Sequence, residues 1–362
     1  MTDSTHATLP RWSWIAPLLG VAGAAAALGL GIHGGLLAVV ILAVLIGAVL
    51  ACVHHAETIA HRIGEPYGAL VLAIAVTIVE VSLIVTLMLA GGHDTETLAR
   101  DSVFAAFMIA TTGITGACLL VSGIRFGEAN FQARGASATL SVLATLAVLT
   151  LVLPNYTIHS VGPSFSPAQL TFVAVVSLLL YMTFLFIQTV RHRGDFLGVD
   201  IETGHIEARP TNRQALQAAA LLLVGLVAVV ALAKSLAPTL DRLVGDFGAP
   251  PAAAGVVIAA LVMLPEGLSA LRATRANRLQ IGLNLALGSA LATISLTIPG
   301  VALASFVLGA PLVLGIGPEE TVLLMLTLLI SAITLVTGRA TILQGAVHLT
   351  IFAVFLLLAA IP

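Results

Sequence analysis

The stretch AVTIVEVSLIV, from Ala75 to Val85, places one glutamate, Glu80, inside a run of apolar residues. The surrounding segment from Ala69 to Ala90 carries no other charge. An acid at the centre of a membrane span costs roughly 3 kcal/mol, so it normally faces an interior pathway of the protein. A second glutamate, Glu266, lies in similar surroundings in VIAALVMLPEGLSAL (257–271). The two acids predict a functional site within a membrane protein.

The composition supports this class. The chain has 362 residues, of which 59% are hydrophobic and only 9% are charged, whereas soluble domains carry about 25% charged residues. The net charge of -2 argues against a nucleic-acid partner. Its two cysteines, Cys52 and Cys118, lie in apolar runs, so no disulfide framework is expected. We expect no cofactor, and the sequence leaves the oligomeric state open.

Apolar runs of about 17–25 residues predict membrane helices. The sequence contains eleven: Trp12–Ile32, Leu36–Ile59, Ala69–Ala90, Val103–Ile124, Ala136–Leu153, Leu170–Val190, Leu216–Leu236, Ala252–Leu271, Ile281–Val307, Thr321–Val336 and Ile342–Ala360. The predicted fold is an all-α polytopic membrane protein with eleven transmembrane helices.

The basic residues predict the orientation of these helices. With eleven crossings, twelve of the fifteen basic residues fall on the same side of the membrane as the N-terminus. The positive-inside rule then places the N-terminus in the cytoplasm and the C-terminus outside. We expect a multi-pass protein of the bacterial inner membrane. The three basic residues on the other side are Arg100, Lys234 and Arg242.

One long polar connection, residues 192–213, divides the chain after the sixth predicted helix. It separates a five-helix repeat at 36–191 from a second five-helix repeat at 214–362, while 1–35 hold an N-terminal tail and the first helix. Two units with an odd number of helices enter the membrane in opposite directions. Their arrangement as 1+5+5 is that of two inverted repeats, as in many secondary transporters.

The two halves match at their acids. Glu80 follows Gly68 by twelve residues, and Glu266 follows Ala254 by twelve, so a shift of 186 superposes them. Each acid lies on the second helix of its half, about 18 Å along the helix axis. Since the two helices run in opposite directions, both carboxylates are predicted to approach the same depth in the membrane.

Paired carboxylates suit hard cations such as Na⁺ or Ca²⁺, which prefer oxygen ligands. Two neighbouring acids in a low-dielectric site are expected to take up protons when no cation is bound and to release them when one binds. Thr77 shares the face of Glu80, and Asn284 and Ser289 on the following helix add candidate oxygen ligands. For Asn284 and Ser289, helix packing is an equally good interpretation. The transported ions expected from this site are Na⁺, K⁺, Ca²⁺ and H⁺.

A second polar cluster occurs in VHHAETIAHRIGEPYG (53–68), at the cytoplasmic end of the second predicted helix. His54, Glu57, His61 and Glu65 follow one another at helical spacing and are candidates for pH sensing or gating, because histidine titrates close to cytoplasmic pH. A solvated cluster at a helix end is the alternative. The spacing is not HExxH, so a zinc protease site is not supported.

The segments GEPYGALVLAIAVTIVEVSLIVTLML (Gly64–Leu89) and LPEGLSALRATRANRLQIGLNLALGSALATISLTIPG (Leu264–Gly300) resemble the two α-repeats of the cation/calcium exchanger superfamily. The similarity is greatest to its ChaA family of bacterial Na⁺, K⁺ and Ca²⁺ proton antiporters. The α-repeat regions would be 64–124 and 252–307. The resemblance implies that Glu80 and Glu266 bind the transported cation. Where calcium–proton exchangers show GNATE and GNAAEH, this chain has AVTIVE and MLPEG, so the choice among the three cations stays open.

The predicted function is therefore secondary active transport rather than catalysis. The chain would exchange cytoplasmic Na⁺, K⁺ or Ca²⁺ for external H⁺ through a shared carboxylate pair by alternating access. A passive cation channel is the alternative. Its partners would be inorganic cations, protons and the lipid bilayer.

Overall fold

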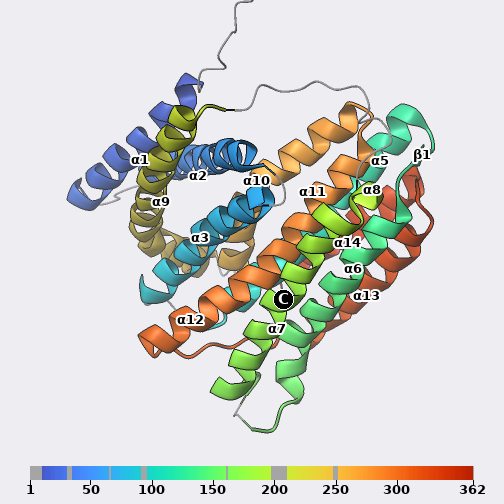
Figure 1. Ribbon diagram of the computed structural model, residues 1–362. Helices are drawn as coiled ribbons and strands as arrows, with labels where there is room; N and C mark the ends of the chain where they lie inside the picture. Colours follow the sequence, from blue (N-terminus) through green and yellow to red (C-terminus); the bar gives the residue numbers. More distant parts are fainter. Residues whose placement is uncertain are drawn as a thin grey trace, which may run out of the picture. The chain divides into compact units, whose positions relative to one another are not determined.

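Helices dominate the fold because a bilayer offers no water to the backbone, so a spanning segment must satisfy its own N–H and C=O groups. In the computed structural model, the second to the eleventh predicted span each lie on one continuous helical segment, and the described part of the first lies on another (Figure 1). The structure describes residues 10–30, 35–64, 67–90, 96–159, 162–196, 210–247 and 252–361. The chain packs as two compact units.

The first unit contains three helices from the start of the chain and most of a long helix from its middle. These are α1 (Arg11–Leu30), α2 (Gly35–Ile63), α3 (Tyr67–Ala90) and α9 (Asn212–Phe247).

The second unit contains the remaining elements. They are α4 (Leu98–Met108), the π-helical segment η1 (Ile109–Ile114), α5 (Thr115–Phe126), β1 (Ala129–Asn130), α6 (Ala133–Ala147), η2 (Val148–Val152), η3 (Leu153–Tyr156), α7 (Pro167–Phe186), η4 (Ile187–Arg191), α8 (Arg193–Phe196), α10 (Ala252–Arg275), α11 (Leu279–Ala292), η5 (Thr293–Thr297), α12 (Ile298–Leu308), α13 (Pro318–Val336), β2 (Arg339–Ala340) and α14 (Ile342–Ala360).

Ten helices among the described residues are long and apolar enough to cross a membrane. They carry the second to the eleventh predicted span, so the chain is a multi-pass membrane protein. The first predicted span lies on α1, which is not among the ten. The eleven-helix count and its 1+5+5 arrangement remain predictions.

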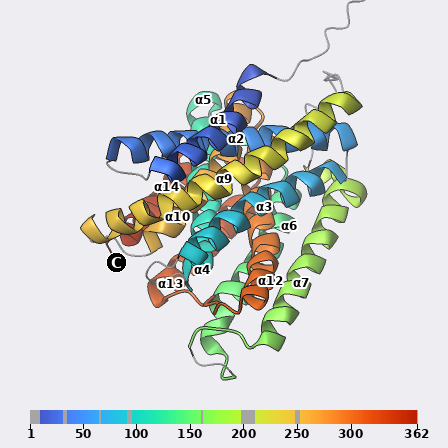
Figure 2. The ribbon, with the colours of Figure 1, turned by 90° about the vertical axis from the view of Figure 1, so that its left-hand side faces the viewer.

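Small residues let the helices of the first unit approach closely. A Cβ added at Gly20 of α1 would lie 2.8 Å from the Cβ of Ala228 on α9 and 3.4 Å from that of Ala48 on α2. Gly225 of α9 likewise meets the sulfur of Cys52 on α2. Figure 2 shows α1, α2 and α9 side by side. Such close contacts are the usual means by which membrane helices associate.

Glycines also set close helix contacts in the second unit. A Cβ added at Gly255 of α10 would lie 2.8 Å from backbone atoms of Asp101 and Ser102 on α4. Along α5 and α14, Gly116 lies against His348, and Gly345 lies against the backbone of Leu120. The helix pairs α4–α10 and α5–α14 are therefore in backbone contact.

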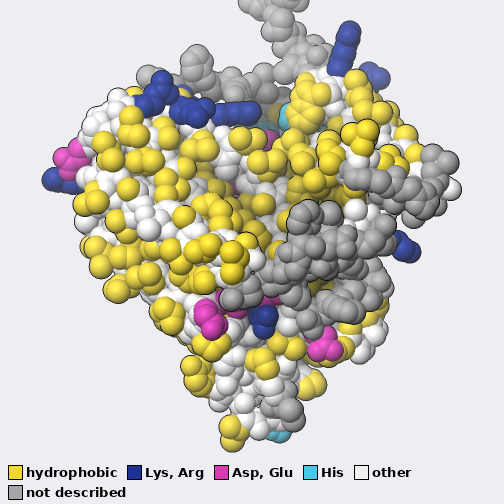
Figure 3. Space-filling model, turned by 180° about the vertical axis from the view of Figure 1, so that it is seen from behind, with side chains coloured by type: hydrophobic (Ala, Val, Ile, Leu, Met, Phe, Trp, Pro, Cys, Tyr) yellow, Lys and Arg dark blue, Asp and Glu magenta, His cyan; other side chains and the backbone are white. Residues whose placement is uncertain are grey.

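The continuous helix from α4 to α5 is charged only near its two ends. Arg100 and Asp101 lie near its start, and Arg125 lies near its end. α10 runs alongside in the same direction, since Gly255 meets Asp101 and the carbonyl of Arg275 accepts a hydrogen bond from Arg125 (3.5 Å). Hydrophobic side chains cover much of the face seen in Figure 3, as expected for a surface in contact with lipid.

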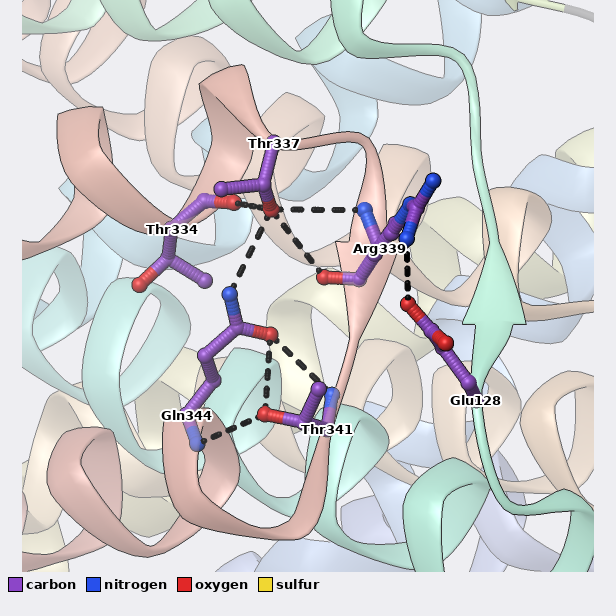
Figure 4. A network of polar contacts seen from close by, with 6 residues as sticks. All are labelled: Glu128, Thr334, Thr337, Arg339, Thr341 and Gln344. Carbon is purple, nitrogen blue, oxygen red and sulfur yellow. Dashed lines mark hydrogen bonds and ion pairs between the residues drawn. The ribbon is translucent and has the colours of Figure 1, made fainter.

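A short ribbon and a polar turn fix the hairpin between α13 and α14. β1 pairs antiparallel with β2, and Arg339 of β2 forms an exposed ion pair with Glu128 (3.1 Å). The hydroxyl of Thr337 donates to the carbonyl of Thr334 (2.7 Å), and Thr341 and Gln344 form a capping box at the start of α14. Figure 4 shows these contacts together.

The described residues include both ends of the predicted linker at 192–213. Residues 193–196 form the short helix α8, and α9 begins at Asn212. Gly135 of α6 lies against the carbonyl oxygen of Asp195, and Phe196 packs edge-to-face on Phe184 of α7 with ring centroids 5.8 Å apart. The start of the linker therefore belongs to the second unit.

Candidate functional site

Glu80 lies near the middle of α3, in the first unit. It is thirteen residues after Tyr67 and ten before Ala90, about 20 Å along the helix. Its side chain is only 1% exposed. The sequence predicted this arrangement, in which an otherwise uncharged helix carries one acid at its middle.

Glu266 has the matching place on α10, in the second unit. It is fourteen residues after Ala252 and nine before Arg275, and it is half-buried. The helix continues through the preceding Pro265. α10 packs against η1, where a Cβ added at Gly267 would lie 3.2 Å from the side chain of Ile114. Glu266 is therefore adjacent in sequence to the point where α10 meets η1.

The segment η1 is a wide helical turn. Three threonines, two within it and one directly after it, each donate a hydroxyl hydrogen bond to a backbone carbonyl. Thr111 donates to the carbonyl of Phe107 (2.6 Å), Thr112 to that of Met108, and Thr115 to that of Ala110 (2.8 Å). Threonine commonly bonds the backbone of its own helix in this way. π-helical turns of this kind are frequent at functional sites.

The three predicted accessory ligands already make hydrogen bonds within their own units. Thr77 donates to the carbonyl of Ala73 (2.8 Å). The amide oxygen of Asn284 accepts from Gln280 (2.9 Å), and its amide nitrogen donates to the carbonyl of Phe196. Ser289 donates to the sulfur of Met263 (3.6 Å), one turn before Glu266 on α10.

These contacts place the accessory residues differently with respect to Glu266. Ser289 contacts α10 at Met263, three residues before Glu266, whereas Asn284 joins α11 to the start of the linker. Their role as cation ligands remains a prediction.

Sequence reasoning did not include Ser295 among the candidate ligands, although it lies on one helical face with Asn284. It is fully buried in η5, and its hydroxyl has no hydrogen-bond partner among the described residues. A buried hydroxyl without a partner costs about 1–3 kcal/mol. A bound cation would satisfy it, which makes Ser295 a further candidate ligand. The signal in the sequence was its position on a polar helical face, which packing explains equally well.

The predicted histidine cluster lies on α2, in the first unit. His54 stacks on Trp12 of α1 with ring centroids 5.2 Å apart, Glu57 is half-buried and His61 is exposed. Glu65 lies outside the described residues. Sequence reasoning did not single out His55, which is fully buried and whose Nε2 donates to the carbonyl of Ser13 (2.8 Å). Part of the cluster thus fastens α1 to α2, and its role in pH sensing remains a prediction.

Comparison with known proteins decides the family. The sodium/calcium exchanger protein family matches residues 33–190 and 217–361, on both sides of the linker. The chain belongs to this family. The matched ranges of this chain include both acid-bearing helices, α3 and α10. The resemblance to the cation/calcium exchanger superfamily is therefore confirmed, and the protein is a transporter rather than an enzyme.

Two relatives and one solved structure are similar over most of their length. The y4hA protein of Sinorhizobium fredii (strain NBRC 101917 / NGR234), named as a candidate ionic transporter, is 49% identical over 98% of both chains. The sodium-potassium/proton antiporter ChaA of Escherichia coli (strain K12) is 38% identical over 86% of both. The structure of native YfkE superposes with a TM-score of 0.75 at 18% identity, covering 97% of this chain and 100% of that one. The last likeness shows a shared fold.

Proposed function

We propose that this exchanger-family protein moves Na⁺, K⁺ or Ca²⁺ out of the cytoplasm in exchange for external H⁺, and that Glu80 and Glu266 share the work of binding. The observation that carries the proposal is the matched position of the two acids, each at the middle of a long apolar helix. Membrane-embedded acids of this kind normally mark an ion pathway. The sodium-potassium/proton exchange named for the ChaA relative supports Na⁺, K⁺ and H⁺ among these ions.

Each carboxylate has two tasks in this mechanism. It offers oxygen ligands to the cation, and it takes up a proton when the cation has left. The cation and the proton therefore compete for the same carboxylate. The hydroxyls of Ser289 and Ser295 and the amide of Asn284 would complete the oxygen ligands. Alternating access would follow from the inverted repeat, with the N-terminus in the cytoplasm and the C-terminus outside the inner membrane.

A passive cation channel would use the same acids differently. It would conduct cations down their gradient without moving protons in the opposite direction. Obligatory proton movement is therefore the quantity that separates the two functions.

The test uses everted membrane vesicles with an imposed pH gradient and a pH-sensitive dye. Na⁺, K⁺ and Ca²⁺ are added separately at several pH values between about 6.5 and 9, because protons and cations are proposed to compete for the same carboxylate oxygens. Glu80→Gln and Glu266→Gln remove each charge with little change of shape. Glu128→Gln, at an exposed surface acid, is the matched control.

We expect one or more cations to collapse the gradient in the wild type and in Glu128→Gln. Neither Glu80→Gln nor Glu266→Gln should respond, although both remain folded and inserted in the membrane. Exchange at the wild-type rate in either of these two variants would disprove the site. Cation currents through purified protein, without proton movement, would support the channel instead.

A further inference from the structure

His348 of α14 is a fully buried histidine with partners at both ring nitrogens. Nδ1 lies 2.9 Å from the carbonyl oxygen of Thr111 in η1, and Nε2 lies 3.3 Å from the hydroxyl of Thr334 on α13. All three elements belong to the second unit. The ring therefore joins three helices at one point inside the protein.

The wide turn of η1 redirects the usual α-helical donor of the Thr111 carbonyl. In a regular α-helix, the N–H of Thr115 would donate to the carbonyl of Thr111. Here it donates instead to the carbonyls of Ala110 and Thr112. The hydroxyls of the three threonines in this turn are used on other carbonyls. His348 thus supplies the carbonyl of Thr111 with a donor in place of the one that the π turn redirects.

The contacts also define the protonation of the ring. A carbonyl oxygen can only accept, so Nδ1 carries the hydrogen. In the neutral ring Nε2 is then an acceptor, and the hydroxyl of Thr334 can donate to it. Thr334 therefore orients the ring, and His348 acts as a neutral donor without any change of charge.

The frame around His348 holds the ring close to η1. A Cβ added at Gly116 would lie 2.8 Å from the Cβ of His348, and Gly345 is in backbone contact with Leu120. At the C-terminal end of α13, in the turn shown in Figure 4, the hydroxyl of Thr337 donates to the carbonyl of Thr334 shortly before α14, the helix that carries His348, begins. Close backbone packing of α14 against α5 therefore fixes the position from which the His348 side chain donates.

η1 also meets α10, the helix that carries Glu266. Ile114, three residues after Thr111, lies against Gly267, the residue after Glu266. We propose that His348 is a positioning residue of the exchanger: its hydrogen bond to Thr111 holds the π turn in the form that places the Glu266 helix for cation binding. This proposal rests on the function proposed above.

Two amide substitutions separate the hydrogen bond from the size and polarity of the side chain. His348→Asn places an N–H donor at about the position of Nδ1, and His348→Gln places it at about the position of Nε2. The first keeps the bond to Thr111, and the second loses it. His159→Gln, at an exposed loop histidine of the same unit, controls for the loss of an imidazole.

Vesicle exchange is measured against cation concentration to separate the half-saturating concentration from the maximal rate. We expect His348→Gln to raise the half-saturating concentration roughly tenfold, the effect of one buried hydrogen bond, with a maximal rate within about twofold of the wild type. His348→Asn should restore the wild-type value, and His159→Gln should not change it. Equal effects of the Asn and Gln variants, or no effect of either, would overturn the proposal.

Hydrogen exchange of the purified protein, followed by mass spectrometry, tests the same bond without transport. Peptides covering residues 109–116 should exchange faster in His348→Gln than in His348→Asn, which should match the wild type. If the wild type shows no cation-dependent proton movement, the proposed function fails. The amide hydrogen-exchange rates alone then decide whether His348 holds η1. Equal rates of amide hydrogen exchange at residues 109–116 in all three proteins would refute that role.

Discussion

Gly255→Ala tests the contact that fixes the acid-bearing helix α10 against α4. The added Cβ would lie 2.8 Å from backbone atoms of Asp101 and Ser102, which no side-chain rotation can move. Carbon atoms pack at about 3.5–4.0 Å, so the helices must separate by roughly 0.7 Å or more. Overpacking of this kind costs about 1–3 kcal/mol.

Gly288→Ala on α11 is the matched control, because a Cβ added there would meet nothing within 4 Å. Both substitutions replace a helical glycine by alanine and gain the same helix propensity, about 1 kcal/mol. The difference in stability between the two variants therefore isolates the steric cost, about 1–3 kcal/mol.

The assay is thermal unfolding of purified protein in detergent, with the remaining monodisperse fraction measured by size-exclusion chromatography. Tryptophan fluorescence is unsuitable, since both tryptophans, Trp12 and Trp14, lie in the first unit. Gly255→Ala should unfold at a lower temperature than Gly288→Ala, and its cation exchange should weaken because Glu266 moves with α10. Equal unfolding temperatures for the two variants would refute the backbone contact between α4 and α10.

Three further substitutions probe separate features. His55→Leu removes the donor to the Ser13 carbonyl and should loosen α1, seen as a red shift of Trp12 fluorescence; an unchanged spectrum would show that the bond is dispensable. Ser295→Ala should raise the half-saturating cation concentration roughly threefold to tenfold in the vesicle assay, and an unchanged value would exclude its hydroxyl as a ligand. Arg339→Ala breaks an exposed ion pair and should change the free energy of unfolding by less than about 1 kcal/mol in a denaturation experiment, so a larger loss would contradict its surface role.

Much of the fold could be predicted from hydrophobic patterning. Apolar runs predicted the helices because, in a bilayer, length and hydropathy alone determine which segments can span. The patterning did not reveal the π turns η1 and η5, which depend on how neighbouring helices pack. It also did not reveal that α9, from the second half of the sequence, packs with α1 and α2.

Only part of the candidate site has a clear signal in the sequence. Glu80 and Glu266 stand out because an isolated acid in an apolar run normally indicates a functional position inside a membrane protein. Asn284 and Ser289 have no such signal, since polar side chains of this kind serve packing and coordination equally well. Only the structure showed that the amide of Asn284 is hydrogen-bonded to Gln280 and Phe196, and that the hydroxyl of Ser295 is buried without a partner among the described residues.

By itself, the sequence determined that the protein spans a membrane, where its helices lie and which two acids occupy their centres, because these properties depend on composition along one segment at a time. The tertiary structure decided which helices touch and which polar groups are already satisfied. His348 is the clearest example, since its partners Thr111 and Thr334 lie 237 and 14 residues away in the chain. Backbone contacts at glycines bring them together, and no local pattern encodes such a meeting.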